Sequence, residues 1–168
     1  MSLRSRRERL LAGKPPMLQA CVAASRELQH AAHWLERSID AALAPCGLHM
    51  REYLALRLLS DSAHEPLRPT TLGVTLDATR TQITRLLDAL EAKGLIARAP
   101  HAHDRRSLQI TLTQAGADAL EQAVPLVQAA YAVAWAPLAD GEVQTLARQL
   151  AQVHAHLRAS AKNAEAAR

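Results

Sequence analysis

Residues 70–112 read TTLGVTLDATRTQITRLLDALEAKGLIARAPHAHDRRSLQITL, and this stretch decides the fold class. Two short segments, 70–76 and 79–93, have apolar residues at helical spacing. The turn between them carries Asp77, a residue type that adopts a left-handed conformation at low cost. Gly94 ends the second helix, and segments 95–99 and 107–112 predict an antiparallel hairpin. Two short helices, a tight turn and a hairpin form a winged helix-turn-helix.

The start of segment 79–93 combines a helix cap with a polar surface. Thr79 and Gln82 have the spacing of a capping box, in which each side chain bonds the backbone amide of the other residue. Apolar residues from 83 to 90 predict the buried face, and the polar residues of the first two turns mostly lie off it. These polar types contact base edges and phosphates. With the hairpin included, we predict DNA contacts by Thr70, Thr79, Arg80, Thr81, Gln82, Thr84, Arg85, Arg98, Asp104, Arg105, Arg106 and Ser107.

The loop of the hairpin is polar and basic, which suits a narrow minor groove. Asp104 lies two residues before Arg106 and could orient that guanidinium through a charge-assisted pair. His101 and His103 could instead ligate a metal together with Asp104. No third and fourth ligand follow in the sequence, so we predict neither a metal nor any other cofactor.

The charge distribution indicates a polyanion-binding surface. The formal net charge is +4, and residues 1–14 carry five basic residues against one acidic residue. Residues 68–106 carry seven basic residues against four acidic ones. Such clustering is typical of nucleic-acid binding, although a solvated tail explains the arm alone better. Aromatic residues make up only 2% of the chain, which argues against binding of single strands by base stacking.

A series of residues between 71 and 116 matches a known family pattern. The matching residues are Thr71-Leu72, Leu76, Thr79, Ile83-Thr84-Arg85, Leu90-Glu91, Lys93-Gly94-Leu95-Ile96, Arg98, Asp104-Arg105-Arg106-Ser107, Leu112-Thr113 and Gly116. This pattern resembles the multiple-antibiotic-resistance regulator (MarR) family, and the layout is similar over residues 17–157. The resemblance implies a homodimer with recognition helices in successive major grooves and, often, a small-molecule effector. Asp77 and Gly73 stand where the family usually has Gly and Ala, and neither departure removes a DNA contact.

The expected fold is mainly α with a small β-hairpin wing, flanked by N- and C-terminal dimerisation helices. We expect a flexible basic arm over 1–16, dimerisation helices over 17–45 and 113–158 with a bend at Pro125, a DNA-binding lobe over 47–112 and a frayed tail over 159–168. Apolar residues from Val143 to Leu157 alternate three and four apart, as in a coiled-coil seam. We expect this seam and the first helix to pack across a two-fold axis, with packing inside one chain as the alternative.

In the layout implied by the resemblance, an effector crevice is lined by the first two helices and the start of the long helix that begins at 113. The residues that these helices would contribute are His30, His33, Trp34, His49, Arg51 and Tyr53. Rings beside cationic groups suit an aromatic acid or similar small anion. The alternative is that Trp34 and Tyr53 fill the core while the histidines face solvent.

Other classes of function fit less well. No phosphate-binding loop, nucleophile elbow or paired-His zinc motif occurs, so we predict that the chain is not an enzyme. A redox-sensing regulator would need a reactive Cys21, but Ser25 occupies the position of the family's sensing cysteine, and we expect Cys21 to be a buried thiol. A partner-binding module without DNA binding would have a neutral or acidic segment 79–93, against Arg80 and Arg85.

The sequence therefore predicts a cytoplasmic, homodimeric regulator of transcription, acting as a repressor on a pseudo-palindromic double-stranded operator. No secretory signal or convincing membrane span is visible, so no membrane partner is expected.

Overall fold

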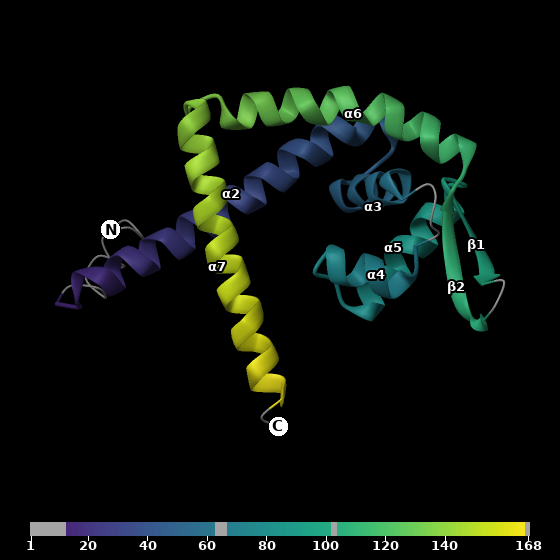
Figure 1. Cartoon of the computed structure of the whole chain (residues 1–168). Coiled ribbons are helices and arrows are strands. Elements are labelled where there is room, and N and C mark those ends of the chain that lie inside the picture. The colour runs from purple at the N-terminus through teal and green to yellow at the C-terminus, as the bar shows by residue number, and fades with distance from the viewer. Residues whose placement is uncertain (1–12, 63–66, 102–103, 167–168) are drawn as a thin grey trace, which may run out of the picture. The chain divides into compact units, whose positions relative to one another are not determined.

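The computed structural model of the chain describes residues 13–62, 67–101 and 104–166, leaving aside the side chains of 101, 104–107 and 165–166. Within these residues it has a two-stranded sheet and is otherwise helical (Figure 1). The elements are α2 (Pro16–Leu43), the 3₁₀ helix η1 (Ala44–Cys46), α3 (Met50–Asp61), α4 (Pro69–Thr75), α5 (Arg80–Ala92), β1 (Ile96–His101), β2 (Asp104–Leu112), α6 (Gln114–Trp135) and α7 (Asp140–Ala166). The expected mainly α fold with a hairpin wing is confirmed. The chain forms two compact units, Met1–Val127 and Gln128–Arg168.

The hydrophobic core of the first unit is built from one face of each short helix and of the hairpin. Burial of these apolar faces is the main favourable contribution to folding. The core includes Leu56, Leu59, Leu72, Ile83, Leu87, Leu90, Ile96 and Ile110. The amide of Ile110 donates to the carbonyl of Leu67 at 3.1 Å, so the segment before α4 pairs with β2 and joins the hairpin to the helices.

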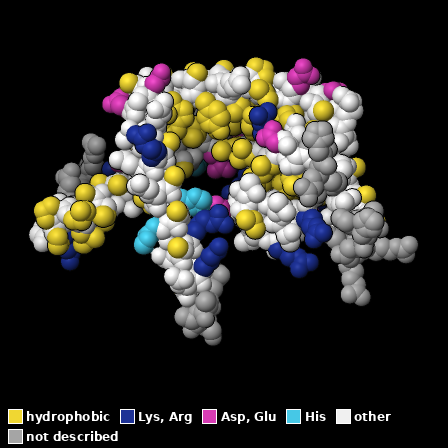
Figure 2. All heavy atoms as spheres, in the orientation of Figure 1, with side chains coloured by type: hydrophobic (Ala, Val, Ile, Leu, Met, Phe, Trp, Pro, Cys, Tyr) yellow, Lys and Arg dark blue, Asp and Glu magenta, His cyan; other side chains and the backbone are white. Residues whose placement is uncertain are grey.

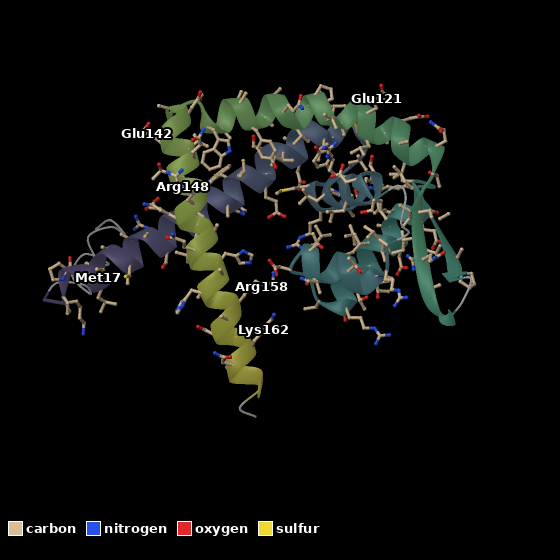
Figure 3. All side chains as sticks on the ribbon, in the orientation of Figure 1. Met17, Glu121, Glu142, Arg148, Arg158 and Lys162 are labelled. Carbon is tan, nitrogen blue, oxygen red and sulfur yellow. The ribbon has the colours of Figure 1, made fainter. Side chains whose placement is uncertain are left out.

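α2 contributes to this core only through its C-terminal end. Ile39 and Leu43 are fully buried. Towards the start of the helix, apolar side chains are 41–75% exposed: Met17, Leu18, Val22 and Leu28. Met17 is labelled in Figure 3, and Figure 2 shows hydrophobic side chains gathered at this end of α2. Cys21 lies in the same stretch and is exposed, so the prediction of a buried thiol is wrong for the single chain. The reason is that this part of α2 extends beyond the core that its C-terminal end enters.

The hairpin is longer than the sequence predicts. β1 and β2 pair in antiparallel register from Ile96 opposite Leu112 to Pro100 opposite Leu108, and the register shifts before His101 opposite Asp104. Residues 104–106, expected in the loop, therefore belong to β2 by their backbone. The predicted contact between Asp104 and Arg106, and the possible metal ligands His101 and His103, fall outside the side chains that the structure describes.

α6 and α7 are long helices. α6 continues through Pro125, and its buried residues within the first unit are Gly116, Leu120, Ala123 and Val127. α7 continues to Ala166, beyond residue 158, where fraying is expected; alanine-rich segments have high helix propensity, which favours this continuation. Within the described residues, no helix is both long enough and apolar enough to cross a membrane.

Candidate DNA-binding surface

The turn between α4 and α5 directs the start of α5. Asp77 adopts a left-handed conformation with φ of +47°, as predicted, and the amide of Ala78 donates to the carbonyl of Gly73 at 2.9 Å. A non-glycine residue accepts this conformation only at a cost, which is smallest for Asp and Asn. The turn therefore favours a small set of residue types at position 77, and it places Thr79 directly after it as the N-cap of α5.

The predicted capping box is present. The amide of Gln82 donates to Thr79 Oγ1 at 3.3 Å, and the amide of Thr79 donates to Gln82 Oε1 at 2.8 Å. Thr79 Oγ1 also donates to Gln82 Oε1 at 3.0 Å. A two-point contact of Gln with adenine needs both the oxygen and the nitrogen of its amide. While the box is formed, Gln82 Oε1 is engaged, and its Nε2 is the end left to contact DNA.

The two faces of α5 differ as the sequence predicts. Ile83, Leu87 and Leu90 are at most 3% exposed, whereas Leu86 is half-buried. The candidate DNA-contacting residues of α4 and α5 are all exposed: Thr70, Thr79, Arg80, Thr81, Gln82, Thr84 and Arg85. Because the cap fixes the first turn and the apolar face anchors the helix, these polar side chains are presented on a rigid element. Their contacts with DNA remain predictions.

The C-terminal end of α5 is held by a part-buried ion pair that sequence reasoning missed. Lys93 Nζ donates to both carboxylate oxygens of Glu52 at 2.7 Å and to the carbonyl of Gly47 at 2.8 Å. Glu52 also accepts from the amide of His49 at 2.9 Å, and its side chain is only 6% exposed. The sequence marks Lys93 as one of the basic residues of 68–106 and as part of the family pattern, without indicating an ion-pair partner. Its partner lies 41 residues away, and one sequence without homologues gives no signal for such a pair.

Arg98, predicted to contact DNA, pairs with two carboxylates of α5 in the same chain. On β1, its Nη2 donates to Asp88 Oδ1 at 2.6 Å, and its Nε lies 3.3 Å from Glu91 Oε2. The geometry at Nε is that of an ion pair without a hydrogen bond, and this atom is buried. The side chain of Arg98 is 17% exposed. The remaining hairpin candidates, Asp104, Arg105, Arg106 and Ser107, have side chains outside the described residues, so their roles stay predictions.

The candidate effector residues divide into an exposed group and one core residue. Trp34 is 65% exposed, with the His33 ring edge-on at 5.8 Å and the Arg37 guanidinium 5.2 Å from its ring centre. Tyr53 is buried, as the core alternative expects, and among the described residues no ring contact joins it to Trp34. The other members are exposed: His30, His49 and Arg51. Arg37 is an addition that the sequence reasoning missed, although its position three residues after Trp34 on a helix was a usable signal.

His49, directly before α3, contacts Asp40 of α2. Its Nδ1 lies 3.6 Å from Asp40 Oδ2, while Asp40 Oδ1 accepts from the amide of Met50 at 2.7 Å. The carboxylate of Asp40 on α2 thus satisfies a free amide at the start of α3, where helices need acceptors. The two contacts of Asp40 therefore hold the start of α3 against α2.

Comparison with known proteins agrees with this geometry. Residues 47–107 match the model of the MarR family. The chain is 31% identical over 100 residues to the HTH-type transcriptional regulator PapX of Escherichia coli, covering 60% of this chain and 57% of PapX. It is 33% identical over 116 residues to an HTH-type transcriptional repressor of Mycobacterium bovis, covering 69% of this chain and 82% of that protein. The chain thus spans little more than half of PapX, but most of the mycobacterial repressor.

Solved structures show the same fold. A mutant of MarR from Escherichia coli, complexed with operator DNA, has a TM-score of 0.74 at 25% identity, covering 83% of this chain and 99% of that one. CouR from Rhodococcus jostii, bound to p-coumaroyl-CoA, has a TM-score of 0.67 at 28% identity, covering 75% of this chain and 87% of that one. Family membership also agrees with the prediction that the chain is not an enzyme. The chain belongs to the MarR family of winged helix-turn-helix transcriptional regulators.

Proposed function

We propose that this protein is a transcriptional repressor that binds a pseudo-palindromic double-stranded operator as a homodimer. The observation that carries this proposal is the capped, polar N-terminal end of α5, presented by a helix whose opposite face is buried. Such an end fits the major groove, where Arg, Gln and Thr side chains read base edges. The similarity to a MarR protein solved with operator DNA supports the same placement.

The exposed apolar side chains of the two long terminal helices support assembly into a dimer. In α2 these are Met17, Leu18, Val22 and Leu28, and in α7 they include Val153 and Leu157, 50% and 60% exposed. Val143, Leu146 and Leu150 continue the α7 seam and are only half-buried in the single chain. A helix with such a seam gains most of its stability by packing against a partner. The proposed partner is a second copy of the chain, related by a two-fold axis.

Selection of bound fragments from random duplex DNA tests this function. We expect a shared inverted repeat with half-site centres about one helical turn apart. Raising salt from about 50 to 200 mM should weaken binding by several powers of ten. Light scattering should report a dimer at the same protein concentration. Binding that is insensitive to salt, with no shared motif among the selected fragments, would falsify the proposal.

The finer part of the proposal concerns release from DNA. We propose that an aromatic acid or similar small anion binds near Trp34 and lowers affinity for the operator. Trp34 offers an exposed ring flanked by His33 and Arg37, and the solved structure of CouR with p-coumaroyl-CoA shows a similar protein with an aromatic acyl ligand. Ring stacking and cationic groups together suit such a ligand. Because ligand and DNA would be coupled, each must weaken the other by the same factor.

A thermal-shift screen of benzoate-, nicotinate- and urate-like compounds, followed by calorimetry with and without operator, tests the effector. Trp34→Ala and Arg37→Gln should weaken binding of any compound that stabilises the parent protein. Arg57→Gln is the matched control, because Arg57 is a half-exposed cation in α3 that pairs with Asp61. Compounds that bind free and DNA-bound protein equally, or bind Trp34→Ala as well as the parent, would rule out this site.

A further inference from the structure

We infer that Arg98 is a positioning residue which, through Asp88 and Glu91, fixes the wing relative to the DNA-reading helix, and that it is not a DNA contact. The inference rests on the proposed DNA binding. It concerns how the hairpin and α5, the two elements proposed to contact DNA, are held in position relative to each other. Arg98 lies on β1, two residues after its start, while Asp88 and Glu91 lie three residues apart on α5. One guanidinium thus joins the hairpin to one face of the helix.

The geometry favours an internal role. Arg98 is 17% exposed, whereas the candidate contacts Arg80 and Arg85 are exposed. Its Nη2 donates to Asp88 Oδ1 at 2.6 Å, and its Nε, with Glu91 Oε2 at 3.3 Å, is buried. A guanidinium that donates to one carboxylate and forms an ion pair with a second is restricted in orientation, because its planar fork is rigid. Moving Arg98 to a phosphate would leave two carboxylates on the DNA-binding lobe without their cation.

The carboxylates are informative because their charge has the wrong sign for DNA binding. Asp88 and Glu91 are 57% and 45% exposed on the same helix that carries Arg80 and Arg85. Each negative charge on that lobe repels phosphates, so removing it should strengthen binding if electrostatics alone mattered. If the carboxylates instead hold Arg98 and the wing in place, removing them should weaken specific binding. The two models therefore predict opposite signs for the same substitutions.

The experiment measures affinity for the selected operator and for unrelated duplex DNA with Asp88→Asn, Glu91→Gln, the double variant and Arg98→Gln. For the double variant we expect operator binding about 5- to 10-fold weaker, the scale of a small charged network. Unrelated DNA should bind as well as before or better, because the variant carries two fewer negative charges. Preference for narrow A·T-rich flanks, which the wing would read, should also fall. Asp61→Asn is the matched control, since Asp61 pairs with Arg57 within α3, and it should not weaken operator binding.

Two further readouts separate positioning from contact. If Arg98 touches phosphate, Arg98→Gln should lower the slope of log affinity against log salt by about one unit, whereas a positioning role leaves the slope nearly unchanged. Hydrogen exchange of the β1 amides in the absence of DNA should be faster in Arg98→Gln and in the double variant. The inference is overturned if the double variant binds operator as tightly as the parent, or if β1 exchange is unaltered. If the parent itself binds no operator, the function proposed above fails, and the exchange measurement still decides whether Arg98 holds the wing.

Discussion

Replacing Lys93 by Met should destabilise the protein more than any ordinary surface substitution. The change removes the cation that contacts both oxygens of Glu52 at 2.7 Å. The Glu52 carboxylate, whose side chain is 6% exposed, then keeps the hydrogen bond from the His49 amide but has lost its cation. Breaking a fully buried ion pair in this way costs about 3–5 kcal/mol. Because the side chain of Lys93 is 36% exposed and water can reach its end of the pair, we expect about 2–3 kcal/mol.

The companion variants follow from the same geometry. Glu52→Gln retains an acceptor for the His49 amide and for Lys93, and it leaves a partly exposed cation, so we expect a cost of about 1 kcal/mol. Adding Glu52→Gln to Lys93→Met removes the stranded charge, so the double variant should be more stable than Lys93→Met alone. The coupling between the two sites should be about 1–2 kcal/mol. Arg57→Met breaks an exposed i,i+4 pair at 3.7 Å and should cost less than about 0.5 kcal/mol.

Urea unfolding followed by far-UV circular dichroism measures these differences, with protein concentration held constant because dimerisation contributes to apparent stability. The expected loss in Lys93→Met corresponds to a fall in melting temperature of about 4–12 °C for a chain of this size. A loss no larger than that of Arg57→Met would refute the reasoning. Strict additivity of Glu52→Gln and Lys93→Met would refute it as well, because the argument requires the cost to arise from their interaction.

Four further substitutions have defined outcomes. Gly116→Ala would place Cβ 2.1 Å from the carbonyl oxygen of Leu95 and 2.8 Å from Leu112 Cδ1, so α6 must shift. The free energy of unfolding in urea titration should fall by about 2 kcal/mol or more, and a stability equal to that of the parent would contradict this close approach. Asp77→Gly should leave stability within about 1 kcal/mol of the parent, whereas Asp77→Val, strained at positive φ, should lose about 1–2 kcal/mol, and equal melting temperatures for the two would argue against the left-handed turn. Gln82→Glu preserves the capping box and should keep thermal stability. It should weaken operator binding about 10-fold or more in gel-shift titration, because a negative charge then faces phosphates, and unchanged affinity would show that Gln82 does not belong to the DNA-binding surface. Cys21→Ser should keep both DNA binding and its relief by any effector, and release of the parent from DNA by peroxide, but not of Cys21→Ser, would show a redox switch instead.

Much of the DNA-binding lobe was predictable because its signals are local. The capping box of Thr79 and Gln82, the left-handed Asp77 and the buried face of α5 each depend on residues within about three turns of one another. The length of β2 was only partly predictable. Whether residues 104–106 belong to the strand or to the loop depends on their pairing with β1, which composition does not indicate. The burial predicted for Cys21 is wrong for the single chain, because an apolar helical face does not specify which surface covers it.

The sequence alone determined the order of helices and strands, the polar and apolar faces of α5 and the family pattern, since spacing along the chain encodes each of them. Only the tertiary structure decided which charges meet. It joined Lys93 to Glu52, and it placed Arg98 against Asp88 and Glu91, where a basic residue on the wing had suggested a DNA contact. It also separated Tyr53 in the core from the exposed Trp34. The physical reason is that ion-pair partners are selected by distance and burial in space, and residues far apart in one sequence carry no local signal of that proximity.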